Sequence, residues 1–401
     1  MGNAAELLRM LVTSRRPKGM MSLNSVEEVK RLARRRLPKM IFDFVEGGAE
    51  DEQTLAANYA DFRAITYRPR VLVDVSKRRT DIKFLGKKLL SPVLLAPAGL
   101  ARLVHPDGEI AAARAAHKAG TVFALSTGSS WSLEEVAEAA EGPLWFQLYL
   151  WGDREVIASM LERADHAGYE ALVLTVDVPI VGKRDRDLRN AMSVPPRVTL
   201  QNFLEVCRKP LWLRTLLKGP PVTFRNFLGM AEGDDAVSLS TYANRELINP
   251  ASNWDDLDWI RTIWKGPLLI KGITTAEDAR EAVAHGAEGI IVSNHGGRQL
   301  DGAPSAIRSL AEISNAVGNK IDLMIDGGIT RGSDVVKAIC LGAKAVMIGR
   351  PWFWGLAAGG EEGVSRVLEI LDDEISRVLA LTGRTEITDL DRSLVNVPSY
   401  W

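Results

Sequence analysis

His295 has the sequence context of a general acid–base residue. It ends an apolar run at 289–295 and is followed directly by two glycines, so its imidazole would stand where a buried strand enters a sharp turn. An imidazole titrates near neutral pH and can take up or release a proton there. The other four histidines close helical stretches before glycine or precede a proline in a loop, contexts that favour structural roles: His117, His166, His285 and His105.

A group of glycines with one arginine could bind an anion. Glycine lets backbone N–H groups close on a phosphate, and a helix beginning near Ser333 would direct its positive end toward the same place. Arg350 adds a guanidinium beside these turns. The pattern therefore predicts a bound phosphate, carried by a substrate or by a cofactor, near four glycines: Gly327, Gly328, Gly332 and Gly349.

These residues need elements that bring them together, and the apolar pattern predicts eight buried strands. Short β-branched runs alternate with Ala-rich amphipathic stretches that end at glycine, which is typical of parallel βαβ units. The runs lie at 93–97, 122–127, 144–149, 171–177, 268–271, 289–295, 322–326 and 345–350. Eight such units favour a (β/α)8 TIM barrel. A doubly wound sheet is the alternative, but no GxGxxG motif follows any run.

In a TIM barrel, active sites form at the C-terminal ends of the strands. Lys271 ends one run, and if it faces inward it would stabilise a group that develops negative charge, such as a reduced flavin ring. Nearly every other run also ends in polar or small residues: Pro97, Ala98, Gly99, Ser126, Gln147, Tyr149, Thr175, Asp177, Ser293, Arg298 and Asp326.

One connection between strands is much longer than the rest. About 90 residues separate Asp177 from Leu268, and a helix at 256–264 accounts only for the end of this gap. An insertion there would lie over the active-site face of the barrel. Before the barrel, Ser25 and Glu28 predict a capping box that opens a helix. The expected organisation is an N-terminal extension, one domain and an insertion within that domain: residues 1–24, 25–401 and 178–255.

Composition limits the function classes. The 401 residues are 46% apolar and carry a formal net charge of −1, which argues against a dedicated nucleic-acid binder. Cys207 and Cys340 are too few for a disulfide framework or a Cys-based metal site, and no metal is predicted. The N-terminal apolar run is short and interrupted by Arg9, so it does not predict a secretory signal. A cytoplasmic location is therefore expected.

Five motifs occur in order along the chain: EGGAED at 46–51, FQLY at 146–149, LTVD at 174–177, SNHGGRQLD at 293–301 and DGG at 326–328. Together they resemble the FMN-dependent L-2-hydroxy acid oxidases and dehydrogenases, from about Leu37 to near Gly383. The resemblance implies a TIM barrel that holds FMN and oxidises an L-2-hydroxy acid to the 2-oxo acid. The long insertion and Gly99 are similar to the membrane-associated lactate and mandelate dehydrogenases of this family.

The resemblance also implies roles for the residues at the barrel mouth. His295 would be the base, Asp177 would orient it, and either a carbanion or a hydride mechanism fits this pair. Arg298 and Arg184 would hold the substrate carboxylate, and Tyr149 would hydrogen-bond the substrate oxygen. The implied FMN contacts are Pro97, Ala98, Gly99, Ser126, Gln147, Thr175, Lys271, Ser293, Asp326, Gly327, Gly328, Gly349 and Arg350.

Two positions depart from the family pattern. A tyrosine that helps to bind the substrate carboxylate is replaced by Phe44, and an arginine near the phosphate is replaced by Thr330. One neutral hydrogen bond is worth roughly 0.5–1.5 kcal/mol, so two arginines would still suffice for the carboxylate. Phe44 and Trp151 near the mouth favour a larger substrate. Arg331 or Arg350 would cover the phosphate charge.

Residues 197–230 mix basic with aromatic and aliphatic side chains, including six Lys or Arg and a single acid, Glu205. This composition is typical of a segment that lies in the headgroup plane of an anionic membrane. A lid packed on the barrel, or a contact between subunits, would use the same apolar residues. The membrane interpretation predicts a peripheral protein on the cytoplasmic face that passes electrons to a quinone or respiratory carrier.

Other interpretations of the chain stay open. An oxidase that uses oxygen and makes hydrogen peroxide is the nearest alternative. Another FMN barrel, such as an isomerase or a nucleotide dehydrogenase, is a more distant alternative, and the lack of a cysteine nucleophile at the barrel mouth argues against the nucleotide dehydrogenase. From a different class, the chain could be a catalytically silent membrane-docking barrel. The family resemblance also favours a homo-oligomer, with a tetramer as the expected form.

Overall fold

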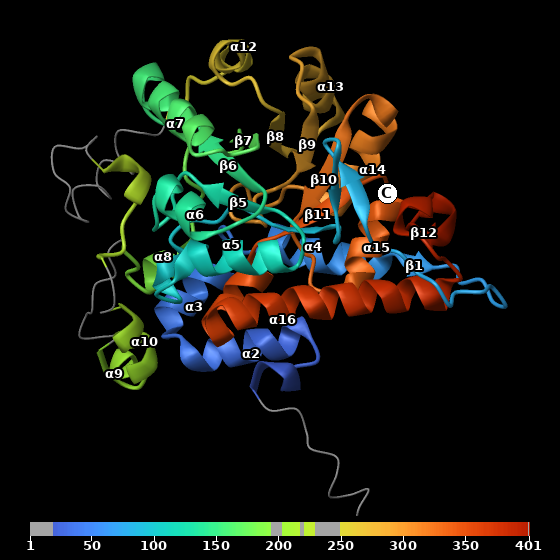
Figure 1. The fold of residues 1–401 in the computed structure, drawn as a ribbon, viewed down its shortest axis with the longest axis horizontal. Coiled ribbons are helices and arrows are strands. Elements are labelled where there is room, and N and C mark those ends of the chain that lie inside the picture. The colour runs from blue at the N-terminus through green and yellow to red at the C-terminus, as the bar shows by residue number, and fades with distance from the viewer. Residues whose placement is uncertain (1–18, 194–202, 217–219, 229–248, 400) are drawn as a thin grey trace, which may run out of the picture.

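The structure is a computed structural model that describes residues 19–193, 203–216, 220–228, 249–399 and 401. Within them, eight parallel strands follow one another in chain order and close into a barrel (Figure 1). The strands are β4 (Val93–Leu95), β5 (Phe123–Ser126), β6 (Leu144–Tyr149), β7 (Ala171–Thr175), β8 (Leu268–Ile273), β9 (Gly289–Val292), β10 (Asp322–Asp326) and β11 (Ala345–Ile348). The predicted TIM barrel is confirmed.

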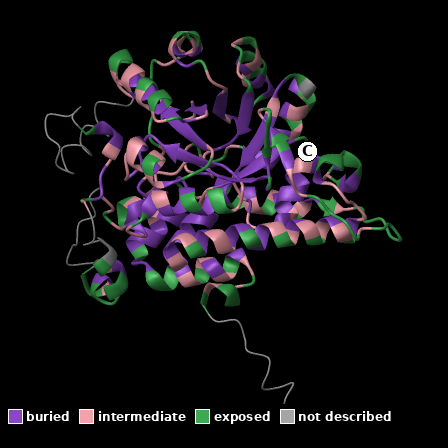
Figure 2. Ribbon diagram, in the orientation of Figure 1, coloured by how far each residue is buried: buried purple, intermediate pink, exposed green. Residues whose placement is uncertain are grey.

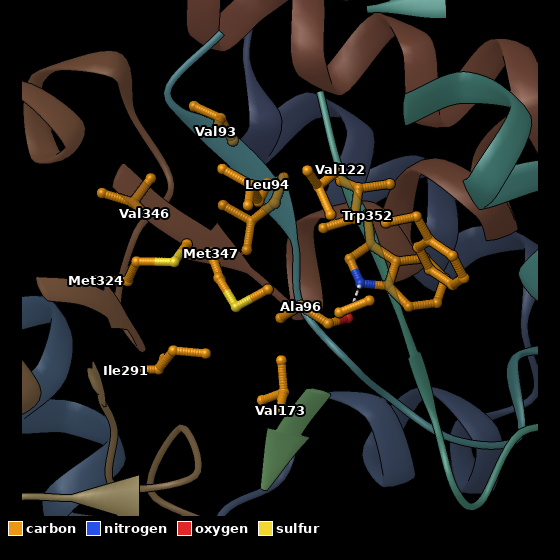
Figure 3. Packing of buried hydrophobic residues seen from close by; sticks show 14 of the residues in the cluster. Val93, Leu94, Ala96, Val122, Val173, Ile291, Met324, Val346, Met347 and Trp352 are labelled. Atoms are coloured by element: carbon orange, nitrogen blue, oxygen red, sulfur yellow. Dashed lines mark hydrogen bonds between the residues drawn. The ribbon is translucent and has the colours of Figure 1, made fainter. Parts of the chain in front are cut away.

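The barrel interior explains why these strands appear in the sequence as continuous apolar runs. Side chains such as Val173, Ile291, Met324 and Met347 project into the space that the strands enclose (Figure 3). The opposite face of each strand packs on helices, so both faces are buried (Figure 2). On that outer side, the indole N–H of Trp352 donates to the Ala96 carbonyl at 3.1 Å.

Helices cover the outside of the barrel, and their ends use local capping. The N-caps Ser132, Asp153 and Thr275 each accept a backbone N–H from the first turn of their helix. The covering helices are α5 (Gly108–Lys118), α6 (Leu133–Ala139), α7 (Arg154–His166), α12 (Asp255–Ile263), α13 (Ala276–Ala284), α14 (Ala306–Val317), α15 (Gly332–Cys340) and α16 (Arg350–Thr382). The backbone of α16 leaves helical geometry at Gly359 and Gly360, where the helix kinks.

The N-terminal segment contains the helices α2 (Val26–Arg36), α3 (Lys39–Glu46) and α4 (Gln53–Ala64). Helix α2 lies along α16 (Figure 1). Ser25 caps α2 as predicted, but the Glu28 carboxylate accepts the N–H of Asn24 rather than that of Ser25. The next two helices run toward the barrel mouth, where Phe44 and Tyr59 enter the site described below.

Short elements complete the fold. Two small antiparallel sheets pair β1 (Thr66–Tyr67) with β12 (Val395–Asn396), and β2 (Ile82–Phe84) with β3 (Lys87–Leu89). The insertion after β7 contains α8 (Asp185–Arg189), α9 (Phe203–Cys207), α10 (Pro210–Leu216) and η3 (Arg225–Phe227). The remaining 3-10 turns are η1 (Gly19–Ser22), η2 (Ala101–Leu103), η4 (Gly318–Lys320), η5 (Ile387–Asp389) and η6 (Arg392–Leu394). In the part of the chain that the structure describes, no helix combines the length and apolarity needed to cross a membrane.

Candidate active site

A large cavity opens at the C-terminal ends of the barrel strands. It measures about 1550 Å³ including its open mouth, and we call it the barrel-mouth cavity. Most of the residues singled out in the sequence line it: Phe44, Pro97, Ala98, Gly99, Ser126, Tyr149, Arg184, Lys271, His295, Arg298, Asp326, Gly327, Gly328, Gly349 and Arg350. Four others lie beyond this lining: Gln147 and Ser293 are fully buried, Asp177 contacts His295, and Thr175 lines a second cavity.

His295 and Asp177 form a hydrogen-bonded pair. The imidazole Nδ1 lies 2.9 Å from a carboxylate oxygen of Asp177, which leaves Nε2 as the ring nitrogen without this partner. Burial opposes a charge on Asp177, yet His295 and Lys271 hold the pKa of this carboxyl below its ordinary value. A carboxylate in this position fixes the orientation of an imidazole and stabilises its protonated form.

The backbone around His295 is held in an uncommon conformation. His295 has a φ of +57°, in the left-handed region that side chains other than glycine rarely adopt. Its N–H donates to the Ser293 hydroxyl at 3.0 Å. Asn294 and Asn58 of α4 exchange two amide hydrogen bonds of 2.9 Å, which tie this turn to the N-terminal segment. Strain that persists at such a turn requires surrounding structure to enforce it.

Lys271, Ser293 and Asp326 form a buried polar triangle. The ammonium of Lys271 lies 2.8 Å from Asp326 and 2.9 Å from the Ser293 hydroxyl, which donates to Asp326 at 2.6 Å. Burial opposes the charge on Lys271, but Asp326 and Asp177 outweigh it and raise the pKa of the lysine. A permanently charged ammonium therefore faces the barrel-mouth cavity from β8.

Three arginines make this cavity electropositive. Arg298 donates to the carbonyls of Phe44 and Gly47 at 2.9 and 2.7 Å. Burial, together with the charges of Arg184 and Arg350, lowers the pKa of Arg298. The Nε of Arg184 is buried and has no hydrogen-bond partner among the described residues. A site that concentrates buried guanidinium groups is suited to anionic ligands.

The structure differs from the sequence prediction in which helix directs its N-terminus toward the expected phosphate site. The N–H groups at the start of α15 are already bound by carboxylates, Asp334 for residues 330 and 331 and Glu374 for Gly332. The expectation that this helix end faces a phosphate is therefore wrong. Instead, α16 begins in the cavity at Gly349 and Arg350, so its positive end is the one that points there.

The two candidate phosphate arginines are in different places. Arg331 is half-exposed and forms an ion pair with Glu374 at 2.5 Å, and it does not line the cavity. Arg350 does line it, and its guanidinium donates to the carbonyls of Glu46, Gly47 and Gly296 at 2.9–3.1 Å. Of the two arginines, only Arg350 lines the barrel-mouth cavity.

Aromatic rings form the outer wall of the cavity. The Arg298 guanidinium lies over the Phe44 ring at 5.5 Å, a cation–π contact at the position that departs from the family pattern. The Tyr149 ring stacks on the Trp151 ring with 4.3 Å between their centroids. The Tyr149 centroid is 6.5 Å from that of the His295 ring. Tyr59 from α4 also lines the cavity, although no sequence pattern pointed to it.

The insertion contributes directly to the site. Phe224 lines the barrel-mouth cavity, where a Cβ on Gly128 would come within 3.3 Å of its ring. The fully buried Asn226 accepts the Leu133 N–H and donates to Ser129 Oγ and to the Thr127 carbonyl, at 2.9–3.0 Å. These contacts hold the loop after β5, so this part of the insertion packs on the barrel as the lid interpretation expects.

Comparison with known proteins identifies the family. Residues 33–397 match the sequence model of the FMN-dependent dehydrogenases. The chain belongs to the FMN-dependent dehydrogenase family. It is 42% identical to the glycolate oxidase of Spinacia oleracea over 373 residues, which are 93% of this chain and 95% of that protein. The predictions of the family, of FMN as cofactor and of an enzyme that oxidises 2-hydroxy acids are confirmed.

Solved structures of this family share the fold. A monotopic membrane protein, (S)-mandelate dehydrogenase, superposes with a TM-score of 0.90 at 42% identity, covering 94% of this chain and all of that chain. A soluble mutant of the membrane-associated (S)-mandelate dehydrogenase from Pseudomonas putida gives a TM-score of 0.80 at 42% identity, with the same coverage. The shared fold of this FMN-dependent dehydrogenase and these relatives is thus the whole TIM barrel, not a part of it.

The residues present fit FMN. The Nε2 of Gln147 is buried on β6, next to Ser126 of the cavity lining, and has no hydrogen-bond partner among the described residues. Leaving a buried donor unsatisfied costs about 1–3 kcal/mol, so this atom calls for a polar ligand. The polar edge of a flavin ring would satisfy it, and the open backbone at Gly349 leaves room for a phosphate beside Arg350.

Proposed function

We propose that this FMN-dependent dehydrogenase oxidises an L-2-hydroxy acid, lactate- or mandelate-like, to the 2-oxo acid and passes the electrons to a quinone or respiratory carrier. The observation that carries the proposal is the hydrogen-bonded His295–Asp177 pair beside an arginine-rich cavity. FMN supplies the acceptor of the electron pair. The chain's own residues bind the substrate and move its proton.

The arginines orient the substrate in this proposal. Arg298 and Arg184 hold the carboxylate, since Arg184 has an unpartnered Nε and Arg298 is fixed by two carbonyls. Tyr149 donates its hydroxyl to the substrate oxygen, because burial raises the pKa of Tyr149 and keeps the phenol protonated. Together they place the reacting carbon beside His295.

Proton transfer is assigned to His295. Nδ1 is engaged by Asp177, so Nε2 takes the proton, either from the α-carbon or from the hydroxyl. Asp177 stabilises the imidazolium that results, because its low pKa keeps it ionised. Lys271 faces the site as a buried cation and would stabilise negative charge on the bound FMN.

The remaining contacts are assigned to FMN. Lys271 and the backbone of Pro97, Ala98 and Gly99 line the same cavity, and Ser126 donates to the Gln147 side chain at 3.0 Å. Asp326 and Ser293 hold Lys271 in place. The phosphate is assigned to Gly327, Gly328, Gly349 and Arg350, all of which line the cavity.

An aromatic 2-hydroxy acid is favoured over a small one. Phe44 and Trp151 offer apolar faces at the cavity, and a phenyl group buried there gains free energy in proportion to the area that it removes from water. The relatives include one named for a small 2-hydroxy acid, a glycolate oxidase, and one named for an aromatic 2-hydroxy acid, an (S)-mandelate dehydrogenase. Comparing the two acids in one assay resolves the preference.

The acceptor proposal is supported by the exposed surface of the insertion. Phe203, Leu204 and Leu211 expose 52%, 68% and 71% of their surface on α9 and α10. Arg208, directly after α9, and Arg214, on α10, are also exposed. Apolar and basic side chains together suit an anionic membrane surface, and we place the protein on the cytoplasmic face. Residues 197–202, 217–219 and 229–230 of the predicted segment lie outside the described residues.

Vesicle binding tests this surface. Trp212 is buried and donates to the Leu103 carbonyl at 2.7 Å, so deleting the whole segment would also damage packing. Substituting Phe203→Ser with Leu204→Ser removes only exposed side chains. We expect the wild type to co-sediment with phosphatidylserine vesicles and the double variant to remain in the supernatant. Equal sedimentation of both would contradict the membrane proposal.

Product analysis tests the proposed reaction. Purified protein is supplied with L-lactate or (S)-mandelate, and the 2-oxo acid is quantified with a short-chain ubiquinone under nitrogen and, separately, in air. We expect quinone-dependent product and little hydrogen peroxide. Stoichiometric hydrogen peroxide in air, with no quinone reduction, would instead establish the oxygen-using alternative.

The protein is also proposed to be a homo-oligomer, with a tetramer as the expected form. Light scattering during size-exclusion chromatography measures the mass that tests this proposal.

A further inference from the structure

A second cavity adjoins the barrel-mouth cavity, and we call it the side chamber. It measures about 890 Å³ including its open mouth and lies among the C-terminal ends of β6, β7 and β8 and the start of α12. Its lining combines apolar and aromatic side chains with neutral polar groups: Leu150, Thr175, Val176, Pro179, Asn249, Ser252, Asn253, Trp254, Leu257, Gly272 and Ile273.

One aromatic stack separates the two cavities. Tyr149, Trp151 and Val178 line both of them. The Tyr149 and Trp151 rings are stacked at 4.3 Å with an interplanar angle of 13°. A flat molecule in the side chamber would therefore be separated by this thin wall from the site where the substrate is oxidised.

The side chamber differs from the barrel-mouth cavity in charge. Among its described lining residues there is no lysine or arginine, and its one acid, Asp278, accepts a hydrogen bond from Thr275 at 2.8 Å. The arginines line only the other cavity. A carboxylate gains nothing in the side chamber, so the chamber suits a neutral ligand rather than the 2-hydroxy acid.

A hydrogen-bond donor in the shared wall has no partner. The indole Nε1 of Trp151 is buried and has no acceptor among the described residues. A carbonyl oxygen of a ligand would satisfy it, and the indole and Trp254 rings offer faces on which a flat ring can stack. The complementary ligand is thus neutral, planar and carbonyl-bearing.

We infer that the side chamber binds the electron acceptor and that this acceptor is a quinone. The inference rests on the proposed function. The 2-hydroxy acid loses two electrons and two protons to become the 2-oxo acid, and the quinone gains two electrons and two protons to become the quinol. The largely uncharged, partly aromatic lining and the unpartnered indole N–H of Trp151 are the observations that favour a quinone as the occupant.

Filling the side chamber tests the inference. Ser252→Trp places a large ring in its lining, whereas Thr262→Trp adds the same ring to the exposed face of α12, away from the lining. The first measurement is the dissociation constant of a short-chain ubiquinone from the oxidised holoenzyme, by calorimetry. We expect Ser252→Trp to raise it roughly tenfold and Thr262→Trp to leave it unchanged.

The two half-reactions give a second readout. Anaerobic bleaching of the flavin by the 2-hydroxy acid should keep its rate and half-saturation in Ser252→Trp, while recolouring by the quinone slows. Trp151→Phe, which removes the N–H from the shared wall and preserves an aromatic ring, should also weaken quinone binding. Unchanged quinone affinity in Ser252→Trp would overturn the inference. So would a Ser252→Trp variant in which the half-saturation concentration rises for the acid and the reaction with quinone is unaffected.

Failure of the inference is distinguishable from failure of the proposed function. If the acids bleach the flavin of the wild type, but Ser252→Trp leaves the quinone dissociation constant unchanged, only the side-chamber inference is contradicted. If no 2-hydroxy acid bleaches the flavin of the wild type, but Ser252→Trp weakens quinone binding, the proposed function is contradicted and the side-chamber inference is supported.

Discussion

Asp177 and His295 are far apart in the sequence, yet their side chains meet at 2.9 Å beside the barrel-mouth cavity. Each lies just beyond the end of its strand, β7 or β9, so the closed barrel brings the two turns together. The pairing leaves Nε2 of the imidazole for chemistry and places a carboxylate behind it. The proposed proton transfer depends on this relationship.

Asp177→Asn should lower kcat by roughly two to four orders of magnitude while changing KM little. The amide cannot stabilise an imidazolium, although it can occupy the same space. The measurement is the anaerobic rate of flavin bleaching at saturating substrate. Asp258→Asn is the matched control, because Asp258 pairs with His285 at 3.1 Å outside the cavity. Similar rates in the two variants would contradict the assigned role.

Phe44→Tyr should tighten the binding of the 2-hydroxy acid. The added hydroxyl restores a donor beside the Arg298 guanidinium, and one neutral hydrogen bond is worth roughly 0.5–1.5 kcal/mol. We expect KM to fall by about two- to tenfold for a small acid such as L-lactate. Steady-state kinetics with lactate and mandelate measure this. A KM that rises for both acids would show that the phenyl ring, not the missing hydroxyl, matters here.

Asn226→Ala should loosen the insertion and destabilise the protein. The variant leaves the Leu133 N–H without its acceptor and removes the hydrogen bonds to Thr127 and Ser129. We expect the free energy of unfolding to fall by about 2 kcal/mol and FMN to dissociate more readily. Urea denaturation and flavin fluorescence provide the two readouts. Asn315→Ala, on an exposed position of α14, is the control and should match the wild type.

Asp372→Asn should stabilise the protein at neutral pH. Burial raises the pKa of Asp372 to about 6, against the opposing hydrogen bond from Ser91. Since the folded state binds this proton more tightly than the unfolded state, the carboxyl costs stability as the pH rises from about 4 to about 6, and the cost is complete above that. The amide stays neutral at every pH.

The expected gain is at most about 3 kcal/mol at pH 7 and close to zero at pH 4. Thermal unfolding at the two pH values measures it. Asp373→Asn is the neighbouring control, because that carboxylate is exposed and pairs with Arg377. A gain of equal size at both pH values would mean that charge on Asp372 is not its cause.

The barrel could be predicted from the sequence because its information is local. Each strand is a short apolar run, and the rule that sites form at strand ends then selected His295, Lys271 and Asp326. Motif resemblance added Asp177 and the arginines. These assignments needed no knowledge of which helix packs where.

The rest of the site depends on contacts between distant segments. Nothing in the sequence near Tyr59 or Phe224 shows that α4 and the insertion reach the cavity. The reciprocal amide pair of Asn58 and Asn294 likewise joins two segments that no periodicity relates. The α15 prediction was wrong for the same reason, since Glu374, which closes that helix end, comes from α16.

The central claim is best tested by the visible spectrum of the purified protein without oxygen, before and after addition of L-lactate and then of (S)-mandelate. We predict flavin bands that at least one of these acids bleaches, the wild type responding rapidly and His295→Gln slowly or not at all. A protein that cannot be reconstituted with FMN, or a flavin spectrum that neither acid changes, would contradict the account.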